Sequence, residues 1–210
     1  MRRGNKQMIL YGAPMPAPNP RRVRIFLAEK GIDLPETPVS LMKREHKSPE
    51  FRAKNSMGQI PTLELDDGTC ISETVSICRY FEETNPEPPL FGTTPVEKAL
   101  VDMWIRRIEF TVMTPVGNFW RHAHPRTAAL LTQFKDFGES NKDTYKGAQK
   151  WLDRELAGKQ FIAGDRYTMA DICLLSTVDF AGWIGLPMGD EFANLKAWHE
   201  RVSARPSAQA

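Results

Sequence analysis

The chain has 210 residues, of which 41% are hydrophobic and 26% charged, and its 28 basic residues nearly balance its 26 acidic ones. This composition predicts an ordinary globular protein with room for one large domain or two small ones. The balanced charge, and the lack of any apolar run near ~18 residues, give no indication of a nucleic-acid or membrane partner.

Three cysteines are scattered along the chain without disulfide or metal-site spacing. Cys70, Cys78 and Cys173 form no Cys-x-x-Cys pair. We therefore interpret them as unbridged thiols in a reducing cytoplasm and expect no metal site. The basic residues 1–7 are followed by an apolar run that is too short for the core of a signal peptide. These features predict a cytoplasmic protein.

The first half of the chain alternates between strand and helix signals. An apolar run at residues 8–11 predicts a buried strand. Asn19 can cap a helix that carries Pro20 in its first turn, and Gly31 ends that helix. Residues 35–39 predict a second strand.

A second helix and a hairpin follow. Residues 48–55 begin with Ser-Pro and predict a short helix. Residues 62–65 and 69–71 flank an Asp-Asp-Gly turn and predict a hairpin, after which a helix is expected over 73–83. This β-α-β-α-β-β-α order is the thioredoxin-like arrangement, in which a cis peptide bond precedes the third strand, here at Pro61.

A proline-rich segment separates two halves with different patterns. Three of the four residues 86–89 are proline, which predicts an extended linker over 86–95. Beyond it the periodicity is helical throughout. We therefore predict an α/β, thioredoxin-like domain over 1–85 and an all-α domain over 96–210.

Two features define helices in the second domain. An apolar residue at every fourth position from Leu100 to Val112 predicts a long helix, which the proline and glycine within 115–117 should kink or end. Thr168 and Asp171 have the spacing of a capping box and open another helix.

An ordered set of residues in the first domain suits a short zwitterionic peptide. Glu73 and Thr74 open a helix, whose N-terminus favours a carboxylate, while the Glu73 carboxylate suits an ammonium group. Ile60, just before Pro61, offers its N–H and C=O to an extended peptide. Each residue alone is compatible with a purely structural role. The combination predicts a site for a molecule with an amino-acid head and a peptide body.

In these features the chain resembles the cytosolic glutathione transferase family over nearly its whole length, and it is most similar to an atypical fungal and bacterial branch that lacks the usual catalytic Ser, Tyr or Cys. The segments that carry the resemblance are 10–12, 22–31, 45–51, 58–63, 73–74 and 168–171. The resemblance implies a detoxification transferase that acts as a homodimer, with glutathione as co-substrate and a small-molecule electrophile as partner.

The resemblance also implies how glutathione would be held. Ile60, beside Pro61, would bind the cysteinyl backbone, and Glu73 and Thr74 would bind the γ-glutamyl end. The glycine carboxylate would be bound by His46, Lys47 and Gln59. Taken alone, Lys47 is also compatible with a solvated surface lysine.

The chain departs from the family where the glutathione thiolate is usually stabilised. The position of the usual serine is Ala17, and no hydroxyl or thiol occurs over residues 13–24. Tyr11 lies at the strand end, where many family members have a tyrosine that only packs. The candidates left in the loop are the N–H groups of Ala17, Asn19 and Arg21, the Asn19 side-chain amide and the helix dipole.

The free energy that such groups must supply is small. Lowering a thiol pKa from about 8.5 to about 6.5 requires about 2.7 kcal/mol of preference for the anion, which one or two charge-assisted hydrogen bonds provide. The branch is also thought to use a water held by a histidine and a serine of the helical domain. His122 is the candidate histidine. Because no serine occurs over 105–139, Thr114 or Thr127 would replace the serine; alternatively, His122 only packs or lies at the surface.

Apolar residues of the helical domain could line a pocket for the electrophile, although aromatic residues at helical spacing are also typical of a core. These residues are Phe110, Met113, Phe119, Trp120 and Trp183, with Met15 facing them. The predicted function is conjugation of glutathione to apolar electrophiles. One alternative is a glutathione-binding regulatory or scaffold protein with little catalysis. Another, a glutathione-dependent disulfide reductase, is disfavoured because its chemistry needs a reactive cysteine at the first helix.

Overall fold

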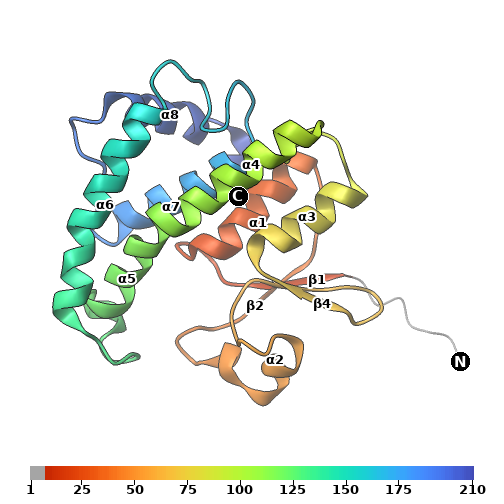
Figure 1. Ribbon diagram of the computed structural model, residues 1–210. Helices are drawn as coiled ribbons and strands as arrows, with labels where there is room; N and C mark the ends of the chain where they lie inside the picture. Colours follow the sequence, from red (N-terminus) through yellow and green to blue (C-terminus); the bar gives the residue numbers. More distant parts are fainter. Residues whose placement is uncertain (1–7) are drawn as a thin grey trace, which may run out of the picture. The chain divides into compact units, whose positions relative to one another are not determined.

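A computed structural model describes residues 8–210, so residues 1–7, and the expectation about a signal peptide that rests on them, lie outside the described residues. The chain divides into two compact units, Met1–Pro89 with Ala210, and Leu90–Gln209 (Figure 1). Among the described residues, none of the helices combines the length and apolar character needed to cross a membrane. None of the three cysteines is in a disulfide, as predicted.

The first unit is built on a four-stranded sheet with the order β2-β1-β3-β4. Its strands are β1 (Ile9–Gly12), β2 (Glu36–Pro38), β3 (Thr62–Glu64) and β4 (Cys70–Ser72). β1 pairs with β2 in parallel, whereas the β1–β3 and β3–β4 pairs are antiparallel. The predicted thioredoxin-like arrangement is confirmed.

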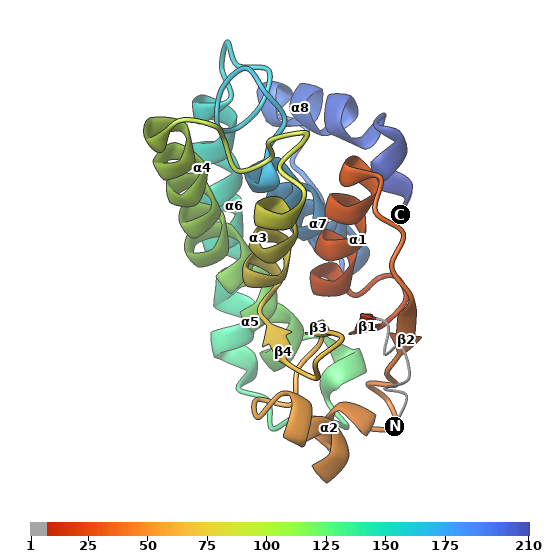
Figure 2. The ribbon, with the colours of Figure 1, turned by 90° about the vertical axis from the view of Figure 1, so that its right-hand side faces the viewer.

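The helices of this unit cover both faces of the sheet. They are α1 (Pro18–Lys30), α2 (Pro49–Lys54) and α3 (Thr74–Thr84), with a 3-10 turn at Glu45–Lys47. Figures 1 and 2 show α1 and α3 on one side of the sheet and α2 on the other. The core of the unit is apolar and fully buried, including Leu10, Phe26, Leu63, Ile77 and Phe81.

Helix α1 begins earlier than predicted, and Asn19 is not its cap. The N-cap is Ala17, which makes no side-chain hydrogen bond, and Pro18 is the first helical residue. Proline suits that position because its missing N–H would have no partner there and its φ is already helical. Asn19 therefore lies inside the first turn. Gly31 ends the helix at φ 65°, as predicted.

Two other local predictions for this unit are confirmed. The Ser48 hydroxyl caps α2 by accepting a hydrogen bond from the Phe51 N–H at 3.2 Å. The peptide bond between Ile60 and Pro61 is cis. Cis bonds also precede Pro16 and Pro88, which no sequence pattern had indicated.

The second unit is helical throughout its regular structure. Its elements are α4 (Pro95–Arg107), a π-helical segment (Ile108–Met113), α5 (Thr114–His122), a 3-10 turn (Pro125–Thr127), α6 (Lys135–Glu155), α7 (Met169–Trp183), α8 (Ala193–Ser203) and a last 3-10 turn (Pro206–Gln209). Helix α7 is buried along most of its length and supplies much of the core. The predicted all-helical second half is confirmed.

The long helix at the start of this unit differs from the prediction in two ways. Its geometry changes before Pro115, through the π-helical segment, and α5 then continues past Gly117. Pro115 lies in the first turn of α5, where proline is tolerated. The buried stripe also does not begin at Leu100, which is 43% exposed, but at its neighbour Val101, which is 3% exposed.

The predicted capping box at the start of α7 is confirmed. The Thr168 N–H and hydroxyl donate to Asp171 Oδ2 at 3.0 and 3.1 Å. The other oxygen, Oδ1, accepts from the Ile162 N–H and from Trp198 Nε1, both at 2.9 Å. One buried carboxylate thus connects the start of α7 to the preceding loop and to α8.

Candidate functional site

Four connecting segments of the first unit open at the same end of its sheet. In the antiparallel β1–β3 pair Tyr11 faces Thr62, so the end of β1 lies beside the start of β3. Thr62 also faces Ser72, which brings the end of β4 to the same edge. In the parallel β1–β2 pair Gly12 faces Pro38, so β2 ends there too. The loop into α1, the residues before β3, the start of α3 and the segment after β2 therefore meet at this edge.

Ile60 presents unpaired main-chain groups at this edge. It is partly exposed and directly precedes the buried Pro61. Within the described part of the chain, neither its N–H nor its C=O has a hydrogen-bond partner. Buried or half-buried main-chain groups are nearly always paired, so an unpaired donor and acceptor in front of a strand can accept an extended peptide as an added strand.

Glu73 and Thr74 lie at the same edge, at the start of α3. Glu73 has φ 68° and ψ 123°, a conformation that is uncommon for a residue with a side chain and costs of order 1–3 kcal/mol. Its exposed carboxylate makes no hydrogen bond or ion pair with any described residue. Thr74 is the first helical residue and is only 7% exposed. A carboxylate, a hydroxyl and a helix N-terminus are thus presented together.

The three residues predicted for the glycine carboxylate are brought together after β2 and before β3. Lys47 Nζ donates to the carbonyls of Met57 and Gly58 at 3.1 and 2.6 Å. Gly58 has φ 56°, and a Cβ there would lie 2.6 Å from the His46 carbonyl oxygen, so only glycine allows this approach. Gln59 follows with an exposed side chain.

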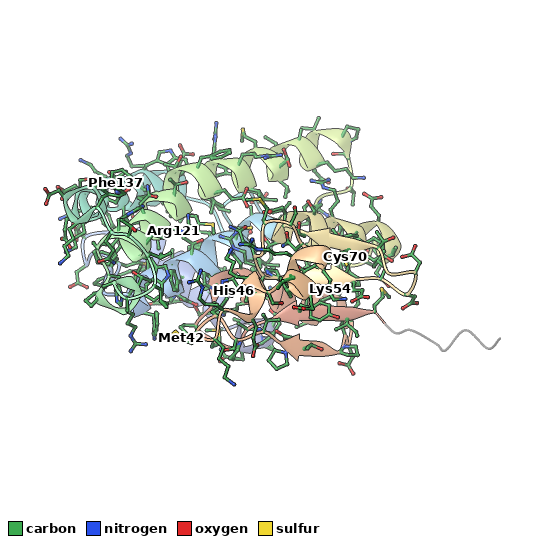
Figure 3. The ribbon with its side chains drawn as sticks, turned by 90° about the horizontal axis from the view of Figure 1, so that it is seen from below. Met42, His46, Lys54, Cys70, Arg121 and Phe137 are labelled. Carbon is green, nitrogen blue, oxygen red and sulfur yellow. The ribbon has the colours of Figure 1, made fainter. Side chains whose placement is uncertain are left out.

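The electrostatic environment of His46 favours a neutral imidazole. Burial, together with the charges of Lys47 and Arg44, lowers the pKa of His46 below its ordinary value. Around pH 7 the positive charge at this part of the edge therefore comes from Lys47 and Arg44 rather than from His46. Figure 3 labels His46, whose backbone belongs to the 3-10 turn before α2.

Asn19 is the best placed of the loop donors named from the sequence. The Ala17 N–H donates to the Pro14 carbonyl at 3.3 Å, and the Arg21 N–H to the Ala17 carbonyl at 3.4 Å. The Asn19 N–H has no acceptor among the described residues. Its side-chain Oδ1 is buried and also has no partner there. Asn19 therefore has an uncommitted main-chain donor in the first turn of α1.

Tyr11 is committed to a structural contact. Its hydroxyl donates to Glu64 Oε2 at 2.8 Å, and Lys54 Nζ lies 2.5 Å from the same oxygen. Burial, and then the hydrogen bond to Glu64, raise the pKa of Tyr11. Because its only proton already serves Glu64, Tyr11 is poorly suited to donate to a thiolate.

His122 and its two possible hydroxyl partners all have contacts within the second unit. His122 Nδ1 accepts from the Phe134 N–H at 3.4 Å, and its ring centroid lies 5.4 Å from that of Phe137. The Thr114 hydroxyl donates to the Glu109 carbonyl of the preceding π-helical segment at 3.0 Å. The Thr127 hydroxyl donates to the Trp120 carbonyl at 2.6 Å. Among the described residues, His122 Nε2 has no hydrogen-bond partner, so this nitrogen is available to a further group.

The aromatic residues expected to line a pocket behave differently from one another. Trp120 and Trp183 belong to one cluster, with centroids 5.6 Å apart, and Trp183 is 42% exposed. Phe119 is buried in the core, whereas Phe110 is 70% exposed. Met15, in the first unit, is 52% exposed.

One residue at the sheet edge carries no sequence motif. Asn55 follows α2 and is 6% exposed. Its side chain makes hydrogen bonds to Met57 and Gln59, in the segment that leads to Ile60, and to Thr62, at the start of β3. The only sequence signal is an asparagine after a short helix, which is equally typical of a simple helix end.

A thioredoxin-like unit followed by an all-helical unit is the architecture of cytosolic glutathione transferases. Residues 17–84 match the profile described as glutathione S-transferase, N-terminal domain, and residues 127–206 match the corresponding C-terminal domain. The chain is 38% identical over 208 residues to glutathione S-transferase 2 of Saccharomyces cerevisiae, covering 97% of this chain and 89% of that protein.

Solved structures give the same result. The crystal structure of Gtt2 from Saccharomyces cerevisiae superposes with a TM-score of 0.90 at 37% identity, covering 96% of this chain and 98% of that one. Glutathione S-transferase-I bound with lactoylglutathione superposes with a TM-score of 0.81 at 27% identity, covering 97% of each chain. The protein belongs to the glutathione S-transferase family, on the branch represented by yeast Gtt2. The co-substrate of this family of enzymes is glutathione.

Proposed function

We propose that this protein is a glutathione transferase that joins the thiolate of glutathione to apolar electrophiles. The observation that carries the proposal is the edge where the unpaired main-chain groups of Ile60 lie at the same end of the sheet as Glu73 and Thr74. Glutathione has the complementary groups, namely an extended backbone around its cysteine and an amino-acid head on its γ-glutamyl residue.

The two ends of glutathione would be bound by opposite charges. At the γ-glutamyl end, the Glu73 carboxylate binds the ammonium group, and the N-terminus of α3 with the Thr74 hydroxyl binds the carboxylate. At the glycine end, Lys47 supplies the positive charge, and His46 and Gln59 supply neutral donors. Pro61 keeps the segment before β3 free of a competing N–H.

The thiolate would be stabilised without a catalytic hydroxyl. The main-chain N–H of Asn19, its side-chain amide and the N-terminal end of α1 are the donors that support this role. A second contribution would come from a water held by His122 through Nε2, since Nδ1 already accepts from Phe134. His122 and Asn19 are therefore the proposed catalytic residues.

The remaining parts of the proposal concern the whole chain. Residues 1–85 would bind glutathione, residues 86–95 would connect the domains, and residues 96–210 would contribute the apolar electrophile pocket. The protein would act as a homodimer, which the exposed apolar side chains of α4 and the π-helical segment support. A cytoplasmic location is supported by three cysteines that form no disulfide.

A binding experiment tests the glutathione site directly. Wild-type protein should be retained on immobilised glutathione, and Glu73→Ala should elute early, because the ammonium group of the ligand loses its carboxylate partner. The matched control is Glu83→Ala, which removes an exposed glutamate from the other end of α3. Full retention of Glu73→Ala on immobilised glutathione would contradict the proposed binding site.

Turnover separates an enzyme from a protein that only binds glutathione. A transferase should conjugate glutathione to a model chloronitrobenzene well above the spontaneous rate. If the protein binds glutathione but converts none of a panel of electrophiles, a regulatory or scaffold role is favoured instead. The observation behind this alternative is Ala17, which lies at the position of the usual catalytic serine.

A further inference from the structure

We propose that Asn55 is a positioning residue for glutathione: its side chain holds the segment before β3 so that the main chain of Ile60 can pair with the cysteinyl backbone. This inference rests on the proposed function, because it explains how the main chain of Ile60 is held in position before glutathione binds. Asn55 itself need not touch the ligand.

The Asn55 side chain uses both its donor and its acceptor on this segment. Nδ2 donates to the Gln59 carbonyl at 2.8 Å and to Thr62 Oγ1 at 3.2 Å. Oδ1 accepts from the Met57 N–H at 3.1 Å. The main-chain carbonyl of Asn55 also accepts from the Gly58 N–H at 2.7 Å. One buried residue thus contacts the segment before and after Ile60.

The main-chain carbonyls of the three residues before Ile60, at positions 57–59, all accept hydrogen bonds from side chains. Lys47 takes the carbonyls of Met57 and Gly58, and Asn55 takes that of Gln59. Thr62 Oγ1 also donates to the Gln59 carbonyl, at 3.2 Å. Ile60 is the next residue, and its C=O and N–H have no partner among the residues described. The structure therefore fixes the neighbours of Ile60 and leaves Ile60 available for a ligand.

An amide at position 55 is required by the chemistry of these contacts. The carbonyl of Gln59 needs a donor and the N–H of Met57 needs an acceptor, and a primary amide supplies both from one short side chain. An aspartate would place a carboxylate oxygen against the Gln59 carbonyl, and an alanine would leave buried groups unpaired. In either variant the segment gains freedom that ligand binding must then remove.

The test compares Asn55→Asp and Asn55→Ala with wild type in glutathione affinity and in steady-state kinetics. Both variants should raise the Kd and the KM for glutathione about tenfold, as expected for one or two lost hydrogen bonds at the binding segment. Turnover at saturating glutathione, and the KM for the electrophile, should stay within about twofold. A residue that only stabilised the fold would reduce the amount of active protein and leave Kd unchanged.

The control is Asn141, which is also 6% exposed but lies in α6 of the second unit. Its Nδ2 donates to the Phe137 carbonyl at 2.6 Å, so Asn141→Ala should lower thermal stability without changing the Kd for glutathione. If Asn55→Ala does not fold, Thr62→Val is the alternative variant: it removes the hydroxyl that donates to the Gln59 carbonyl and should also raise the Kd for glutathione. Folded Asn55 variants with wild-type Kd would overturn the inference. Failure of the wild type to bind glutathione would instead overturn the proposed function.

Discussion

Asn19 lies in a segment where prolines have removed most main-chain donors. Prolines occupy positions 14, 16, 18 and 20, and the N–H groups of Ala17 and Arg21 are used within the chain. The N–H of Asn19 and its side-chain amide are therefore the donors of this loop best suited to a thiolate. In this chain a main-chain group and an amide would replace the hydroxyl that other family members use.

Replacing Asn19 by alanine should raise the pKa of the thiol of bound glutathione by about one unit, because one charge-assisted hydrogen bond of about 1.4 kcal/mol is lost while the main-chain donor remains. The thiolate absorbs in the ultraviolet, so a pH titration of the bound complex measures this shift. Conjugation should fall about fivefold near pH 6.5, where the ionised fraction drops from about one half to about one tenth, and change little near pH 9, where the thiol is ionised in both proteins.

Tyr11→Phe is the control for this titration. Its hydroxyl donates to Glu64, so its removal should leave the thiol pKa unchanged. An unchanged pKa in Asn19→Ala together with a raised pKa in Tyr11→Phe would assign the thiolate to the strand end.

At the same scale, sequence reasoning can propose a residue that belongs to a motif but not one whose role depends on the folded loop. Ile60, Glu73 and Thr74 could be proposed because a cis-proline and a helix start are local patterns. Asn55 could not, because apart from the Thr62 hydroxyl its partners are main-chain atoms of residues 57–59, and a main-chain carbonyl has no sequence signature. The unusual φ of Glu73 is likewise invisible before the fold is known.

At the scale of elements, α4 is held at its start by a reciprocal cap. Thr94 Oγ1 accepts from the Glu97 N–H at 3.2 Å, and Glu97 Oε2 accepts in return from the Thr94 N–H at 3.2 Å. The same oxygen also accepts from the Thr93 hydroxyl and N–H at 2.6 and 2.8 Å. The second carboxylate oxygen pairs with Arg166, in the loop before α7. These contacts, with the Thr93 hydroxyl the largest, lower the pKa of Glu97 to about 2.

This pKa makes the cap sensitive to acid in a defined direction. Because the folded-state pKa is below the ordinary value of 4.5, the cap contributes its full stability above about pH 4.5 and loses it as the pH falls towards 2. Glu97→Gln should therefore be less stable than wild type at pH 7, and the difference in urea midpoint should shrink by pH 2.5. Glu83→Gln controls for the loss of one negative charge. A difference that is equally large at both pH values would contradict the role of the ionised cap.

Helix boundaries were predicted well where a single capping residue defines them. Ser48, Gly31 and the pair Thr168–Asp171 each act as the sequence suggested. The start of α1 was missed because alternating prolines offer two equivalent first positions, at 18 and 20, and packing chooses between them. The π-helical segment 108–113 was missed because its hydrophobic pattern hardly differs from that of an α-helix.

At the scale of the whole molecule, the two units have separate cores and different exposed surfaces. The second unit exposes three large apolar side chains on α4 and the π-helical segment: Val96 at 68%, Leu100 at 43% and Phe110 at 70%. If these side chains form one contiguous patch, it is the kind of surface that another molecule covers. In this family a second copy of the chain is the expected partner.

Phe110→Glu should therefore weaken the proposed dimer, because a carboxylate buried in such an interface would have no partner and would cost several kcal/mol. Sedimentation should show a shift towards monomer at concentrations where the wild type is dimeric. Met42→Glu is the matched control, since Met42 is 73% exposed in the first unit (Figure 3). A variant that remains fully dimeric would place the interface on another surface.

The unpaired N–H and C=O of Ile60 have one more implication, for selectivity among peptides. A ligand residue recognised only through its backbone can change its side chain without losing those contacts. A tripeptide in which alanine replaces the cysteine of glutathione should thus occupy the same edge and compete for it. Such a competitor would inhibit conjugation while offering no sulfur for the reaction, and it would separate recognition of the peptide from activation of its thiol.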